Sequence, residues 1–132
     1  MLIEAGLSVF AFETIPNIKE INAVRTLLLN YPDIEAWISV TLKDHNHLSD
    51  GTPLEAVMEV VNEINNILGF GVNCTSVTVI DAAVDKLIAL SDKPLILYPN
   101  SGRQYDVVHK VWIDREDVSL VEAAPRWKEK GV

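Results

Sequence analysis

Short apolar runs alternate along this chain with longer segments in which apolar residues recur every three or four positions. The short runs are rich in β-branched and aromatic side chains, which is typical of strands. They cover residues 8–12, 35–40, 70–72 and 94–98. The longer segments have the spacing of amphipathic helices and cover residues 18–30, 53–68, 79–90 and 119 to about 130. The pattern therefore predicts four successive strand–helix units.

Polar and helix-terminating residues separate these elements. Thr52 is a candidate N-cap of the second helix, with Pro53 at its first helical position, and Gly69 is predicted to end that helix. The polar stretch 43–51 and the long stretch 103–118 are predicted to be loops.

Strands that alternate with helices imply an α/β fold with a parallel sheet covered by helices on both faces. Neither a G-x-G-x-x-G nor a P-loop pattern follows any strand, so a nucleotide-binding doubly wound fold loses its usual support. Four βα units also correspond to half of an eightfold barrel, which takes about 250 residues. With 132 residues, the chain is expected to be one domain, residues 1–132, that forms an incomplete barrel.

Composition narrows the class of partner. The chain has 11 Lys and Arg against 19 Asp and Glu, a net charge of −8, which argues against nucleic acid or an anionic membrane as a partner. The single cysteine excludes an intrachain disulfide and suits a reducing cytosol, so a cytoplasmic location is expected. No apolar run reaches the roughly 18 residues that span a bilayer, and the first residues lack the basic region of a signal peptide.

Residues able to do chemistry follow each predicted strand. In βα folds the carboxyl ends of the strands form one common face, which is where active sites lie. The candidate site residues on this face are Glu13, Thr14, Ser39, Thr41, Asn73, Cys74, Tyr98 and Asn100.

Four motifs at these strand ends resemble those of the homocysteine S-methyltransferases, in the family's order and along nearly the whole chain. The motifs are ETIPN at 13–17, WISVT with LSDGTP at 37–41 and 48–53, GVNC at 71–74, and YPNSG at 98–102. The resemblance is closest to the branch that uses S-methylmethionine or S-adenosylmethionine. It implies a homocysteine-methyltransferase-type (β/α)8 barrel, of which this chain would cover about strands four to seven.

The resemblance implies a site as well as a fold. Glu13 would hold the ammonium group of homocysteine, and Cys74 would be one of three cysteine ligands of a zinc ion. Thr14, Ser39, Thr41, Asn73, Tyr98 and Asn100 would line the substrate face. Members of the family carry earlier βα units and a later GGCC segment that supplies two more zinc ligands, and this sequence contains neither.

The expected chemistry follows from the thiol group of homocysteine, which is a poor nucleophile when protonated. Free thiols have pKa values near 8.5, and coordination to Zn²⁺ deprotonates them. Three cysteine thiolates leave a fourth tetrahedral position for the substrate sulfur, which then attacks the methyl carbon of a sulfonium donor to give methionine. For this chain alone, with one of three ligands, little or no turnover is expected.

Two further hypotheses stay open at this point. The chain could be a non-catalytic half-barrel that folds or self-associates through its exposed edges, because a parallel sheet cut in mid-barrel leaves two strand edges without a partner. It could also be a different small-molecule protein of similar fold, since fold alone does not decide function. A lone cysteine is usually a small buried hydrophobe, and Glu13 could be a surface carboxylate near a helix N-terminus. His45, His47 and His109 are interpreted as solvated loop residues.

Overall fold

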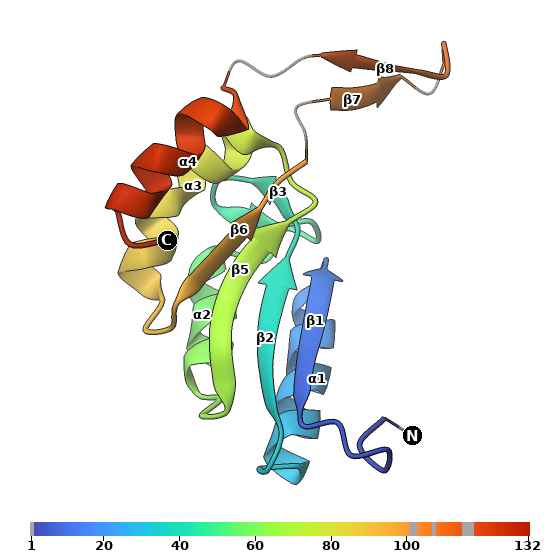
Figure 1. The fold of residues 1–132 in the computed structure, drawn as a ribbon, viewed down its shortest axis with the longest axis vertical. Coiled ribbons are helices and arrows are strands. Elements are labelled where there is room, and N and C mark those ends of the chain that lie inside the picture. Colours follow the sequence, from blue (N-terminus) through green and yellow to red (C-terminus); the bar gives the residue numbers. More distant parts are fainter. Residues whose placement is uncertain (1, 101–102, 107, 115–117) are drawn as a thin grey trace.

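The computed structural model describes residues 2–100, 103–106, 108–114 and 118–132 (Figure 1). The four main strands are β1 (Val9–Ile15), β2 (Glu35–Val40), β5 (Ile67–Asn73) and β6 (Leu95–Tyr98). The helices are α1 (Ile18–Asn30), α2 (Leu54–Asn62), α3 (Val77–Leu90) and α4 (Leu120–Glu129). Two small hairpins are formed by β3 (Leu42–Asp44) with β4 (His47–Leu48) and by β7 (Arg103–Asp106) with β8 (Val111–Asp114).

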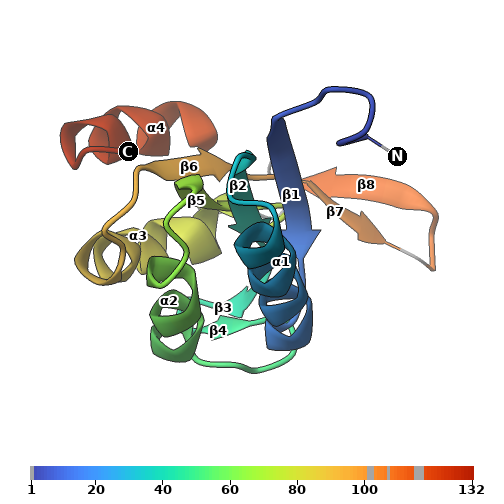
Figure 2. The ribbon, with the colours of Figure 1, turned by 90° about the horizontal axis from the view of Figure 1, so that it is seen from below.

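The four main strands form one parallel sheet in the order β1-β2-β5-β6, so each strand lies beside the one before it. Figure 2 shows α1, α2 and α3 on the same side of this sheet, with α4 beside α3 and β6. The expectation of helices on both faces was therefore wrong. A doubly wound sheet reverses its strand order, whereas a barrel adds strands in one direction and keeps its helices outside.

The core lies between the sheet and this layer of helices. On β2, the buried residues Ala36, Ile38 and Val40 alternate with residues of the opposite face. The helices contribute a further buried row, which includes Ile21, Leu28, Val57, Ile80 and Leu87. The opposite face of β1 is largely exposed, as expected of a strand at the open edge of a sheet.

Two strands are longer than the apolar pattern indicates. Strand β1 runs on through Glu13 and Thr14 to Ile15, where the sequence predicted an end. Its register against β2 shifts between Phe12 and Ile15, which is a bulge at those two polar residues. Strand β5 begins at Ile67, so Gly69 lies inside a strand and does not end the preceding helix.

Helix α2 is correspondingly shorter than predicted and stops at Asn62. Its N-cap is Pro53, and no side chain caps it, so the predicted role of Thr52 was wrong. The hairpin of β3 and β4 and the hairpin of β7 and β8 lie in the two stretches predicted to be loops. Strand β2 and helix α1 have the predicted bounds.

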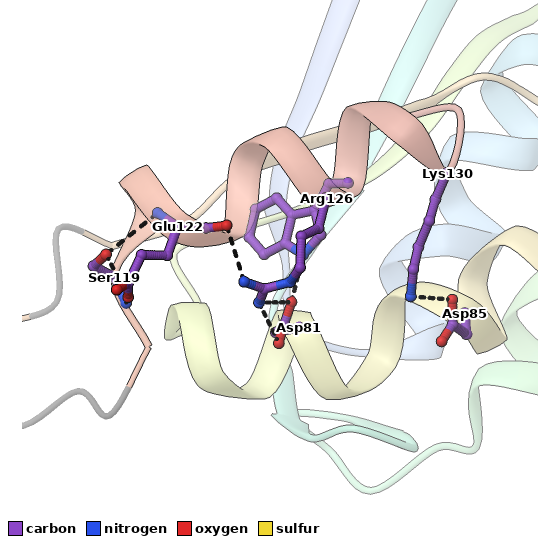
Figure 3. A network of polar contacts seen from close by, with 7 residues as sticks. Asp81, Asp85, Ser119, Glu122, Arg126 and Lys130 are labelled. Atoms are coloured by element: carbon purple, nitrogen blue, oxygen red, sulfur yellow. Dashed lines mark hydrogen bonds and ion pairs between the residues drawn. The ribbon is translucent and has the colours of Figure 1, made fainter.

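Helix α4 is anchored to α3 by a polar network (Figure 3). Asp81 on α3 accepts hydrogen bonds from the Arg126 guanidinium at 2.9 and 3.0 Å and from the Trp127 indole Nε1 at 2.8 Å. One helical turn further along, Lys130 pairs with Asp85 at 2.6 Å. Helix α4 continues through Pro125, although proline cannot donate a backbone hydrogen bond, because a capping box at Ser119 and these contacts hold it.

Candidate functional site at the carboxyl ends of the strands

The carboxyl ends of β1, β2, β5 and β6 meet at one edge of the sheet, as the sequence predicted (Figure 1). The register pairs Ser39 with Gly71 and Asn73 with Tyr98. Because side chains alternate along a strand, Ser39, Asn73 and Tyr98 share the face opposite the helices. This face would be the interior of a barrel.

The amide of Asn73 is the centre of the site. Its Oδ1 accepts hydrogen bonds from the Thr14 N–H and from the Ser39 hydroxyl, both at 3.0 Å. Its Nδ2 donates to the Thr14 Oγ1 at 2.7 Å and to the Cys74 Sγ at 3.4 Å. All four hydrogen-bonding positions of a buried amide are thus used by three different strand ends.

Tyr98 extends this network to Glu13. Its hydroxyl lies 2.6 Å from the Ser39 Oγ and donates to the Glu13 Oε1 at 2.9 Å. Burial raises the pKa of Tyr98 above its ordinary value, the Ser39 hydrogen bond opposes that shift, and the Glu13 carboxylate adds to it. The contact joins β1 to β6, the two outermost strands of the sheet, and gives the exposed Glu13 side chain a defined orientation.

Two residues of the site have left-handed backbone conformations. Thr14 has φ 62° and Cys74 has φ 50°. For a β-branched residue such as threonine this region is an outlier, and each such residue costs about 1–3 kcal/mol. The Thr14 Oγ1 lies 3.8 Å from the Cys74 Sγ, so the two strained residues are in contact. Strain of this kind is typical of functional sites, where surrounding hydrogen bonds maintain it.

Two predicted residues lie at the edge of this arrangement. Thr41 has its hydroxyl 2.8 Å from the Ser49 Oγ and does not join the Asn73 network within the described residues. Asn100 is exposed, and its backbone N–H donates to the Thr75 carbonyl at 3.0 Å. Ser101 and Gly102 of the same motif lie outside the described residues.

Sequence reasoning missed two residues that organise the site, Thr75 and Asp50. Thr75 is buried, and its hydroxyl and carbonyl form hydrogen bonds at the ends of three strands. The Asp50 carboxylate accepts from the Thr52 N–H at 2.8 Å and from the Ile18 N–H at 3.1 Å, and the second bond satisfies the first N–H of α1, whose N-cap is Asn17. Burial acts to raise the pKa of Asp50, but these N–H donors outweigh it and hold the pKa below its usual range. The motif LSDGTP contains Asp50, which was the available signal.

The metal-ligating potential of this face rests on Cys74. Its thiol is exposed and accepts the Asn73 N–H. Over residues 2–100, 103–106, 108–114 and 118–132, no group of three or more His, Cys, Asp or Glu lies close enough to hold a metal ion. His47 pairs with Asp44 at 2.8 Å, and His109 pairs with Asp106 at 2.7 Å. The described residues thus offer one thiol toward a zinc site and do not complete one.

No helix in the described part of the chain has the length and apolar character to cross a bilayer. This finding agrees with the absence of a long apolar run in the sequence.

Known proteins that resemble this chain include homocysteine S-methyltransferases and a selenocysteine Se-methyltransferase. The homocysteine S-methyltransferase of Escherichia coli is 40 % identical over 132 residues, and the homocysteine S-methyltransferase YbgG of Bacillus subtilis is 42 % identical over 131 residues. These matches include 98 % of this chain but 43 % and 42 % of the relatives. The chain therefore spans less than half the length of either relative.

The structural comparison agrees. The crystal structure of the apo form of the homocysteine methyltransferase MmuM from Escherichia coli superposes with a TM-score of 0.80 at 37 % identity. The superposition covers 99 % of this chain and 44 % of that chain. This match confirms the predicted fold class, parallel βα repeats that form part of a homocysteine-methyltransferase-type barrel. The sequence pattern of the family matches residues 1–132, and the chain therefore belongs to the homocysteine S-methyltransferase family.

Proposed function

We propose that this chain forms part of the active face of an enzyme that transfers a methyl group from a sulfonium donor to homocysteine, giving methionine. One observation carries the proposal. In a chain of this family, polar side chains from four parallel strand ends meet in one cluster: the Tyr98 hydroxyl donates to the Glu13 carboxylate and lies 2.6 Å from the Ser39 Oγ, and the Asn73 amide bonds both Ser39 and the Cys74 sulfur.

Glu13 is the proposed ligand of the homocysteine ammonium group. Its Oε1 accepts the Tyr98 hydroxyl at 2.9 Å, and this bond orients the carboxylate. A carboxylate fixed in this way accepts a charge-assisted hydrogen bond, which is about twice as strong as a neutral one. The exposed Thr14 and Asn100 and the half-buried Thr41 would contact substrate, whereas the buried Ser39 and Asn73 would support them.

Cys74 is the proposed metal ligand on this face. A zinc ion, when bound, would supply a thiolate at neutral pH by coordinating the substrate sulfur. The Escherichia coli relative has also been crystallised in a metallated form. Because this sequence has one cysteine, any further thiolate ligands would come from polypeptide outside it.

The proposed reaction balances without an oxidant or a reductant. The homocysteine thiolate forms a bond to the methyl carbon while the bond from that carbon to the donor sulfur breaks. The electron pair of the broken bond stays on the donor sulfur, which changes from a sulfonium to a neutral thioether. The protein has to align the two substrates in line, and a network anchored on four strands supplies the rigidity for that.

A non-catalytic reading has its own supporting observation. An apolar hollow of about 300 Å³ beside the edge strand β1 is lined by Leu2, Phe10, Phe12, Leu27 and Tyr31, among others. Such a surface needs cover from further polypeptide or from another copy of the chain. Under this alternative the chain folds or self-associates and transfers no methyl group.

Metal analysis and a methyl-transfer assay distinguish these readings. Zinc per chain is measured for the wild type and for Cys74→Ser, and methionine formation is measured with homocysteine and either S-methylmethionine or S-adenosylmethionine. When the chain is assayed together with polypeptide that supplies the remaining thiolate ligands, the proposal expects zinc that is lost in the variant and methyl transfer that depends on that zinc. Zinc-free protein that forms no methionine, and whose particle size exceeds that of one chain, would support the non-catalytic reading.

The role of Glu13 has a matched control on the same sheet. Glu13→Gln should raise the KM for homocysteine by about tenfold or more, because it removes a charged acceptor worth about 1.5–3 kcal/mol. Glu35→Gln changes an exposed glutamate at the opposite end of β2 and should leave the KM unchanged. Equal KM values in the two variants would remove Glu13 from the substrate site.

A further inference from the structure

We infer that Thr75 is a positioning residue, which holds the Cys74 sulfur in its place on the active face through its side-chain hydroxyl. The inference rests on the proposed function in one respect, which is the role of Cys74 as the metal ligand of the active face. Thr75 itself is buried, with 4 % of its surface exposed, and would touch neither substrate.

The hydroxyl of Thr75 connects the ends of β2 and β5. Its Oγ1 donates to the Asn73 carbonyl at 3.1 Å, a bond that spans Cys74. The same oxygen accepts from the Leu42 N–H at 3.0 Å, in the segment that follows β2. The hydroxyl therefore uses its one donor position and one of its two acceptor positions.

The main chain of Thr75 reaches a third strand. Its carbonyl accepts from the Asn100 N–H at 3.0 Å, in the turn that follows β6. The next residue, Ser76, caps α3 by accepting from the Val79 N–H. Thr75 thus joins the turn after β6 to the helix that follows Cys74, in addition to the two strand ends bound by its hydroxyl.

This arrangement fixes Cys74 from both sides. The neighbours Asn73 and Thr75 are 3 % and 4 % exposed, while Cys74 lies exposed between them in a left-handed conformation. A non-glycine residue holds that conformation only where its surroundings impose it. The bond from Thr75 to the Asn73 carbonyl closes the turn, and the Asn73 Nδ2 then meets the sulfur at 3.4 Å. Loss of the hydroxyl would let the turn relax and would separate the sulfur from its donor.

The test uses the reactivity of the sulfur, which can be read without metal or homocysteine. Cys74 is the one cysteine of the chain, so alkylation by iodoacetamide reports on it alone. The rate is measured on the folded full chain at fixed pH for the wild type, Thr75→Ser, Thr75→Ala and Thr75→Val. Cys74→Ser supplies the blank, and urea unfolding gives the stability of each variant.

The hydroxyl-bearing variant should differ from the two variants without a hydroxyl. Thr75→Ser should react within twofold of the wild type. Thr75→Ala and Thr75→Val should react about fivefold more slowly, because the sulfur loses one hydrogen bond worth about 1 kcal/mol. The Ser and Ala variants both lack the methyl group, so their comparison isolates the hydroxyl even if Thr75→Val does not fold.

Two outcomes would overturn the inference. In the first, Thr75→Ala reacts at the wild-type rate although it is less stable, which would make Thr75 a purely structural residue. In the second, Thr75→Ser slows as much as Thr75→Ala, which would assign the effect to packing. Absence of zinc or of methyl transfer in the wild type would count against the proposed function and would leave this alkylation contrast intact.

Discussion

Replacement of Asp81 by alanine should destabilise the fold by an amount that the contacts in Figure 3 allow us to work out. The substitution removes two kinds of partner at once. The Trp127 indole is 3 % exposed and would lose its acceptor at 2.8 Å. The Arg126 Nη2 would lose its bonds to both carboxylate oxygens, but the Arg126 side chain is 48 % exposed.

The buried partner accounts for most of the expected loss. A buried N–H left without an acceptor costs about 1–3 kcal/mol. An ion pair as exposed as that of Arg126 contributes about 0.2–1 kcal/mol, because water and salt screen it. Asp81→Ala should therefore lower the free energy of unfolding by about 1–4 kcal/mol.

Urea unfolding followed by tryptophan fluorescence measures this loss, and Asp85→Ala provides a matched control. Asp85 lies one turn along α3 and pairs only with Lys130 among the described residues, and its side chain is 77 % exposed. Its replacement should cost less than about 0.5 kcal/mol. High salt should remove the part of the Asp81 effect that is due to Arg126 and leave the part due to Trp127. Equal losses for Asp81→Ala and Asp85→Ala would refute the reasoning.

Three further predictions concern the sheet and the site. Gly71→Ala should cost more than about 3 kcal/mol in urea unfolding, because an added Cβ would overlap the Ile96 carbonyl oxygen, a backbone atom of β6 that cannot turn aside; a small loss would mean that the two strands separate readily. Tyr98→Phe should cost about 1 kcal/mol in the same assay, since it removes the hydroxyl between Ser39 and Glu13; an unchanged midpoint would show that these bonds add no stability. The lowered pKa of Asp50 means that the unfolded chain takes up the proton first, so its contribution is full above about pH 4–5 and is lost as the pH falls through the folded-state pKa. Stability measured between about pH 5 and 3 should therefore fall less in Asp50→Asn than in the wild type; equal slopes would contradict this sign.

The repeating pattern of the chain determined its architecture. Helix α1 and strand β2 have the predicted bounds. Asn17 begins the helix and residues 31–33 end it, whereas β-branched and aromatic residues make up the strand. The position of polar residues after each strand was also sufficient to predict that these residues gather at one edge of the sheet. In a parallel sheet, all carboxyl ends lie at the same edge.

The local sequence pattern was insufficient to predict element bounds where tertiary contacts determine the backbone conformation. Glu13 and Thr14 are polar and seemed to end β1, yet a bulge against β2 keeps them in the strand and returns Ile15 to the core. Gly69 is typical of a helix end, but close approach to Pro94 and Ile96 places it inside β5. Neither the bulge nor this close approach has a signal within a few residues of sequence.

The site shows the same division. The sequence by itself identified Glu13, Asn73 and Cys74 as residues at strand ends, because their motifs and the strand period are both local features. Which atoms meet is decided by side chains 59 to 85 residues apart, as in the bonds of Asn73 to Thr14 and of Tyr98 to Glu13. The left-handed backbone at Cys74 and the three-way contacts of Thr75 depend on the packing of several strand ends together. Only the tertiary structure could show them, because a buried hydrogen bond has to be satisfied by whatever the fold brings within reach.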